Sequence, residues 1–136
     1  MMHVSGLYAA LGALLISVLA LRVMSLRHRH HVGLGAGGNE SLARAIRAHA
    51  NAVEYLPIAL LLLLILELNQ TRVWLVHVFG IVLIVARVLH AIGLSARPGY
   101  SFGRFVGTAL TIAVMLAMAL LLLWQFAVLP GMFEEP

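Results

Sequence analysis

The chain has 136 residues, of which 62% are hydrophobic and 10% are charged, with a formal net charge of +4. A soluble domain is about 45–50% apolar and about 25% charged, so an ordinary soluble protein is excluded and the excess apolar surface must face lipid. The sparse, scattered positive charge predicts no nucleic-acid partner, and the absence of cysteine excludes disulfides and thiolate metal sites.

Four segments are apolar over the roughly 20 residues that a helix needs to cross a bilayer. Each is expected to be helical, because lipid offers no hydrogen-bond partner to an open backbone. The first segment lacks a preceding basic stretch and is longer than a signal-peptide core of about 7–15 residues, so we expect it to be retained. The sequence predicts an all-α integral membrane four-helix bundle, a single domain over 1–136, with helices at about 4–26, 42–68, 73–95 and 102–129.

The connecting loops differ in basic residues, which predicts the orientation of the chain. Arginines cluster in and beside the first and third loops, whereas the second loop carries a single one; these are Arg22, Arg27, Arg29, Arg97, Arg104 and, in the second loop, Arg72. Basic loops stay in the cytoplasm. We therefore expect the first and third loops to be cytoplasmic and both termini to be periplasmic.

Polar residues inside the second and third helices mark a candidate site. Four of them, spaced by three, four and three residues, share one face of the second helix: Arg44, Arg47, Asn51 and Glu54, with Tyr55 beside them. On the third helix, Arg87 and His90 share a face. Both groups fall in the cytoplasmic half of the predicted membrane, where polar residues are costly and often functional.

Two interpretations of these residues remain open. In a structural one, Arg44 and Arg47 extend to the membrane surface, and Glu54 pairs with Arg87 to hold two helices together. In a functional one, they bind a ligand with several carboxylates and an amine. Arginine grips carboxylates with its planar fork, Glu54 accepts the ammonium group, and Asn51 bonds to a peptide unit.

The second helix resembles the signature of the MAPEG family, the membrane-associated proteins of eicosanoid and glutathione metabolism. From Arg44 to Pro57 the chain fills every fixed position of the pattern Arg-x-x-Arg-Ala-x-x-Asn-x-x-Glu-x-x-Pro. The segment 87–90 is similar to the family's third-helix segment, and the glycine-rich run 35–39 is similar to its bacterial branch.

The resemblance implies a homotrimer in the bacterial inner membrane that uses glutathione as co-substrate and needs no metal. The glutathione ligands would be Arg44, Arg47, Asn51, Glu54, Tyr55, Arg87 and His90. The sequence departs from the pattern at Ala43, where many members have Glu, and at His90 and Leu94, where the leukotriene-forming enzyme has tyrosines.

The residue that would activate the thiol is less clearly assigned by the resemblance. Its position falls near Ser101, with Arg97 and Arg104 on either side, and we assign the catalytic role to Arg104. An arginine there would hold the glutathione thiol as thiolate, since a nearby cation favours the charged form.

Three functions follow, in decreasing order of support. The first is a glutathione-dependent transferase or peroxidase acting on lipophilic small molecules that arrive from the membrane lipid. The second is a non-catalytic scaffold of the same family that binds lipid or glutathione. The third is a small proton-coupled drug exporter, which would favour a carboxylate in the first span, where this chain has none.

Overall fold

The computed structural model of the chain describes residues 3–96, 99 and 101–128. It contains four helices: α1 (Val4–His30), α2 (Glu40–Leu68), α3 (Val73–Ala96) and α4 (Phe102–Val128). All four are long and apolar enough to cross a membrane. The predicted all-α membrane fold of four helices is confirmed.

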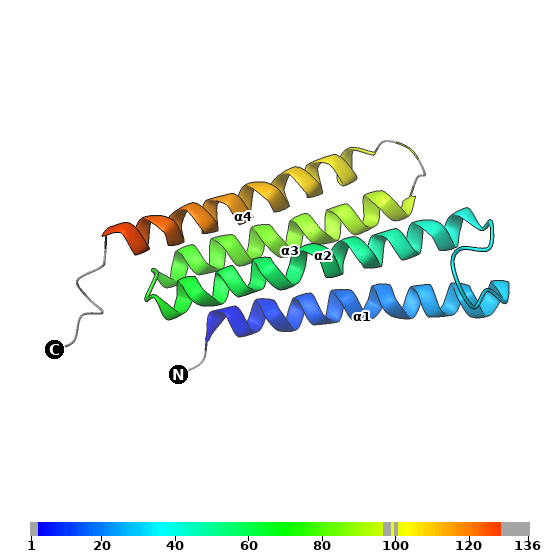
Figure 1. The fold of residues 1–136 in the computed structure, drawn as a ribbon, viewed down its shortest axis with the longest axis horizontal. Coiled ribbons are helices and arrows are strands. Elements are labelled where there is room, and N and C mark those ends of the chain that lie inside the picture. The colour runs from blue at the N-terminus through cyan, green and yellow to red at the C-terminus, as the bar shows by residue number, and fades with distance from the viewer. Residues whose placement is uncertain (1–2, 97–98, 100, 129–136) are drawn as a thin grey trace.

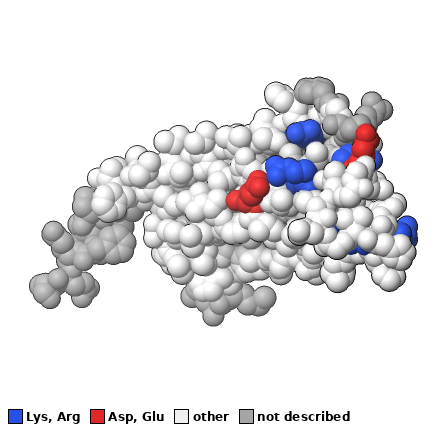
Figure 2. Space-filling model, turned by 45° about the vertical axis from the view of Figure 1, so that its right-hand side comes forward, with Lys and Arg blue, Asp and Glu red and all other residues white. Residues whose placement is uncertain are grey.

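The helices run alongside one another in an elongated bundle, with α2 and α3 between α1 and α4 (Figure 1). The loop between α1 and α2, the end of α3 and the start of α4 lie at one end of the bundle. The start of α1, the end of α4 and the short α2–α3 loop lie at the other. In Figure 2 the charged side chains lie between the middle of the molecule and the end that carries the loop between α1 and α2, and most of the face shown is uncharged.

The helix boundaries follow local capping. Asn39 is the N-cap of α2, because its Oδ1 accepts a hydrogen bond from the backbone N–H of Leu42 at 2.9 Å. α1 continues beyond the predicted end at residue 26, to His30, and stops where His31 adopts a left-handed conformation. Its last turn consists of basic residues, which complement the negative end of the helix dipole. The predicted end of α4 at residue 129 lies outside the described residues.

A stripe of buried residues along α2 forms much of the core: Leu42, Ala45, Ala48, Ala52, Leu56, Ala59, Leu63 and Leu66. They recur every three or four residues, as the inward face of a helix requires. Large apolar side chains on the outer faces of all four helices remain exposed, as expected of surfaces that contact lipid. Pro57 lies within α2, which continues past it to Leu68.

Close approach of α3 and α4 depends on glycine. A Cβ atom at Gly107 would lie 2.6 Å from both the carbonyl oxygen of Ala86 and the backbone nitrogen of His90. Only a residue without a side chain fits this contact, which is the usual way in which small residues bring membrane helices together. This contact places the first turns of α4 against the last turns of α3.

Candidate functional site

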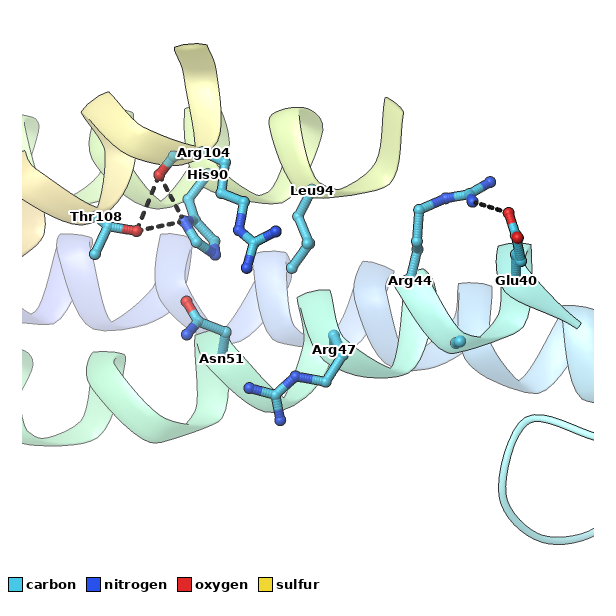
Figure 3. Close-up of a pocket in the computed structure, with 9 residues that line it drawn as sticks. Glu40, Arg44, Arg47, Asn51, His90, Leu94, Arg104 and Thr108 are labelled. Carbon is cyan, nitrogen blue, oxygen red and sulfur yellow. Dashed lines mark hydrogen bonds and ion pairs between the residues drawn. The ribbon is translucent and has the colours of Figure 1, made fainter. Parts of the chain in front are cut away.

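A cavity of about 550 Å³ lies between α2, α3 and α4 near the end of the bundle that carries the first and third loops. Its volume is within the range of about 300–1,000 Å³ that is usual for small-molecule sites. It is lined by Glu40, Ala43, Arg44, Arg47, Asn51, His90, Leu94, Arg104 and Thr108 (Figure 3).

Three of the predicted residues of α2 reach this cavity. Arg44 is half-buried and forms an ion pair with Glu40, one helical turn earlier, at 3.4 Å. Arg47 is exposed and forms no hydrogen bond or ion pair with any residue of the described part of the chain. A charged side chain that lines a cavity without a protein partner is free to bind an anionic group of a ligand.

The third member, Asn51, is held from behind by Arg87. Arg87 is buried, with 2% of its surface exposed, and its Nη1 donates a hydrogen bond of 2.8 Å to Oδ1 of Asn51. Its guanidinium also lies 5.3 Å from the centre of the Tyr55 ring, at the distance of a cation–π contact. Neither Arg87 nor Tyr55, both predicted ligands, lines the cavity; in one chain Arg87 holds Asn51, and Tyr55 contacts Arg87.

His90 enters the cavity from α3, at the contact with α4. It is 4% exposed, and its Nδ1 lies 2.9 Å from the hydroxyl oxygen of Thr108 and 3.2 Å from the carbonyl oxygen of Arg104. The Arg104 side chain is exposed and extends beside His90 in Figure 3. The geometry thus brings a histidine and an arginine from two helices to one wall.

Of the three residues considered for thiol activation, two can be placed. The Oγ of Ser101 donates to the carbonyl of Gly93 at 2.9 Å and accepts from the backbone N–H of Arg104 at 3.3 Å. Ser101 is therefore engaged as the cap of α4, whereas Arg104 lines the cavity. Arg97 lies outside the described residues.

Glu54 is a third predicted ligand, besides Arg87 and Tyr55, that does not line this cavity. It is exposed on α2, beyond the lining, and has no hydrogen-bond or ion-pair partner within residues 3–96, 99 and 101–128. The described chain does not form the Glu54–Arg87 pair that the structural interpretation required: Arg87 donates to Asn51, and its Nε has no hydrogen-bond partner among the described residues.

Comparison with known proteins agrees with the four-helix membrane fold. The model of the MAPEG family matches residues 5–124. The chain belongs to the MAPEG family. It is also 43% identical to the inner membrane protein YecN of Escherichia coli strain K12 over 121 residues, which cover 89% of this chain and 91% of that protein. The YecN protein of Escherichia coli O6:H1 matches with the same identity and coverage. Together with the four apolar helices, these relatives support a multi-pass inner membrane protein.

Two residues that line this cavity were not singled out from the sequence. Thr108 follows Arg104 by four residues, so the spacing places both on one face of α4, and a threonine in so apolar a helix was the available signal. Glu40 precedes Arg44 by four residues, which is the spacing of a helical ion pair. It lies two residues before the predicted start of the second helix at residue 42, whereas the observed α2 begins at Glu40 itself.

Proposed function

We propose that this MAPEG protein binds glutathione in the cavity between α2, α3 and α4 and uses it in a transferase or peroxidase reaction on lipophilic electrophiles. The observation that carries the proposal is the convergence of Arg47, Asn51, His90 and Arg104, from three helices, on one cavity. Glutathione has two carboxylates, an ammonium group, two amides and a thiol. The cavity offers groups of matching charge and hydrogen-bonding type.

The assignment of roles follows from the chemistry of each side chain. Arg47 and Arg44 are suited to carboxylates, because guanidinium groups bind them with two parallel hydrogen bonds. Asn51 has its carbonyl occupied by Arg87, which leaves its NH₂ group as a donor for a carboxylate or peptide oxygen. Arg104 is the cation we assign to the thiol, because Ser101 is engaged as a helix cap.

We also propose that the functional unit is a homotrimer and that Glu54 completes the site across a contact between subunits. Glu54 would accept the ammonium group of glutathione. Its exposure and its lack of a partner within the described chain support this role, because a carboxylate that faces lipid alone is costly. A site completed in this way would also contain more of the ligand than one chain encloses.

Calorimetric titration of the detergent-solubilised protein with glutathione tests the binding proposal. We expect saturable binding, weakened on the order of tenfold or more by Arg47→Ala, because a charge-assisted hydrogen bond contributes roughly 1.5–3 kcal/mol. Arg72→Ala is the matched control, since Arg72 is exposed at the opposite end of the bundle. Absence of binding by the wild type, or equal affinities of wild type and Arg47→Ala, would contradict the assignment.

The non-catalytic scaffold is the second candidate function. It is favoured by the departure at Ser101, which leaves no arginine at the position where the resemblance places one. The two candidates differ in one measurable property, the ionisation of bound glutathione. A scaffold leaves the thiol protonated at neutral pH, whereas an enzyme of this kind stabilises the thiolate.

A further inference from the structure

The hydrogen bonds of His90 define which of its ring nitrogens carries a proton. The Thr108 hydroxyl donates its single hydrogen to the carbonyl oxygen of Arg104 at 2.9 Å, so its oxygen is left to accept. The second neighbour of Nδ1, the same Arg104 carbonyl at 3.2 Å, is an acceptor only. Nδ1 therefore faces two acceptors and is the protonated nitrogen, which in a neutral imidazole leaves a lone pair on Nε2.

That Nε2 atom is buried and has no hydrogen-bond partner among the described residues. Its edge of the ring faces away from Thr108, towards Asn51 and the side chain of Arg104 (Figure 3). Buried polar atoms are nearly always satisfied, so an unpaired acceptor at the wall of a cavity indicates a donor supplied by a ligand. A thiol is one such donor, and its proton is acidic enough to be transferred.

We propose that His90 is the base that removes the thiol proton of bound glutathione. In this step the S–H bond breaks, the proton binds to Nε2, and the electron pair stays on sulfur. The thiolate then lies beside the Arg104 guanidinium. The inference rests on the proposed glutathione site and adds a route for the proton, which an arginine alone does not provide.

The charged residues around His90 are compatible with transfer of the proton from the glutathione thiol to the imidazole within the site. Arg87 lies one turn before His90 on α3. The other charged groups line the cavity: Arg44, Arg47 and Glu40 from α2, and Arg104 from α4. An imidazolium formed there lies among several cations. The thiolate formed in the same step compensates its charge, so the two charges appear and disappear together. The net charge of the complex does not change, and no proton has to leave the site.

The test measures thiolate and released protons in the same sample. Wild-type protein in detergent and weak buffer is mixed with glutathione near neutral pH; ultraviolet absorbance reports thiolate, and an indicator dye reports protons. S-methylglutathione, which has no thiol proton, gives the baseline. We expect thiolate with almost no proton release. Release of one proton per thiolate by the wild type would overturn the proposal.

Two variants sharpen the result. His90→Gln keeps a polar amide near the position of Nε2 but is not basic, and we expect the thiolate fraction to fall on the order of tenfold. Thr108→Val keeps the shape of the side chain and removes the nearer of the two acceptors of Nδ1–H, so it should lower the thiolate fraction as well. If both variants retained the wild-type thiolate fraction and proton balance, His90 would not be the base.

A control variant and a binding measurement distinguish a failure of this inference from a failure of the proposed glutathione-binding function. His77→Gln changes a histidine of the same helix that bonds to the Tyr8 hydroxyl at 2.7 Å, far from the cavity, and should leave both signals unchanged. Glutathione that binds without forming thiolate overturns the role of His90 and leaves the binding site intact. Absence of binding in calorimetry overturns the proposed function and this inference with it.

Discussion

Arg104 is the residue on which the distinction between enzyme and scaffold depends. Its guanidinium is exposed at the cavity wall, beside His90, where it can lie near a ligand sulfur. A cation near the sulfur should bring the pKa of bound glutathione well below the usual thiol value of about 8.5. Arg104→Ala should raise that pKa again and leave binding largely intact, because the other side chains contact the peptide. An ultraviolet pH titration of the complex measures the shift. Should Arg97→Ala move the titration instead, the thiol is activated by that residue.

Arg87 acts through Asn51. Its guanidinium is almost fully buried and donates one N–H hydrogen bond to the side-chain carbonyl of Asn51. Arg87→Leu should destabilise the protein by roughly 1.5–3 kcal/mol, the contribution of a hydrogen bond to a charged group. It should also weaken glutathione binding several-fold, because the Asn51 amide is no longer held in one orientation. Thermal unfolding in detergent and calorimetry check the two effects. Unchanged unfolding would contradict a structural role for this buried cation.

At the scale of the helices, the contact between α3 and α4 determines how close Thr108 and Arg104 of α4 lie to His90 of α3 in the cavity wall. Gly107→Ala would place a methyl group against two backbone atoms of α3, which can yield only if the helices separate. We expect a loss of about 1–3 kcal/mol, typical of overpacking, together with reduced thiolate formation because Thr108 moves away from His90. Gly6→Ala in α1 is the control. Its new methyl group meets nothing within 4 Å, so it should be neutral or slightly stabilising.

The sequence predicted what depends on one helix at a time. Apolar length identified the four spans, and the spacing from Arg44 to Asn51 identified three residues that do share a cavity. Contacts between helices could not be predicted in the same way from the sequence. The partner of Arg87 depends on how α2 and α3 pack, and the Thr108–His90 bond depends on how closely Gly107 lets α4 approach α3. Neither distance is encoded in a spacing along one helix.

For the whole molecule, the orientation in the membrane is testable because the chain has no cysteine of its own. We expect Leu34→Cys and Gly99→Cys to be labelled only from the cytoplasm, and Arg72→Cys only from the periplasm, as the distribution of arginines predicts. Leu34 is 92% exposed, and a side chain at Gly99 meets nothing within 4 Å, so both positions accept the change. Membrane-impermeant maleimide on intact cells and on inverted vesicles makes the measurement. Labelling of the first two positions from outside would invert the topology.

Assembly into a trimer is the expectation with the largest consequence for the whole molecule. Glu54 lies near the middle of the 29-residue α2, about 21 Å along the helix from Glu40, and it is exposed without a partner in the described chain. A lone carboxylate at that depth would face the hydrocarbon core, where it is costly. A contact with a second copy of the chain removes it from lipid and brings it towards a neighbouring site.

Native mass spectrometry from mild detergent should therefore detect three chains, and a distribution of only monomers or dimers would count against the prediction. Cross-linking between subunits tests the symmetry of the assembly. Leu61 is 49% exposed and lies two turns after Glu54 on the same face of α2, so Leu61→Cys should form a disulfide between subunits under oxidation. Each cysteine pairs only once, so a threefold assembly leaves about a third of the chains uncrosslinked. Complete conversion to covalent dimer would instead indicate twofold symmetry. Leu116→Cys, at an exposed apolar position on α4 instead of α2, serves as the control and should remain monomeric.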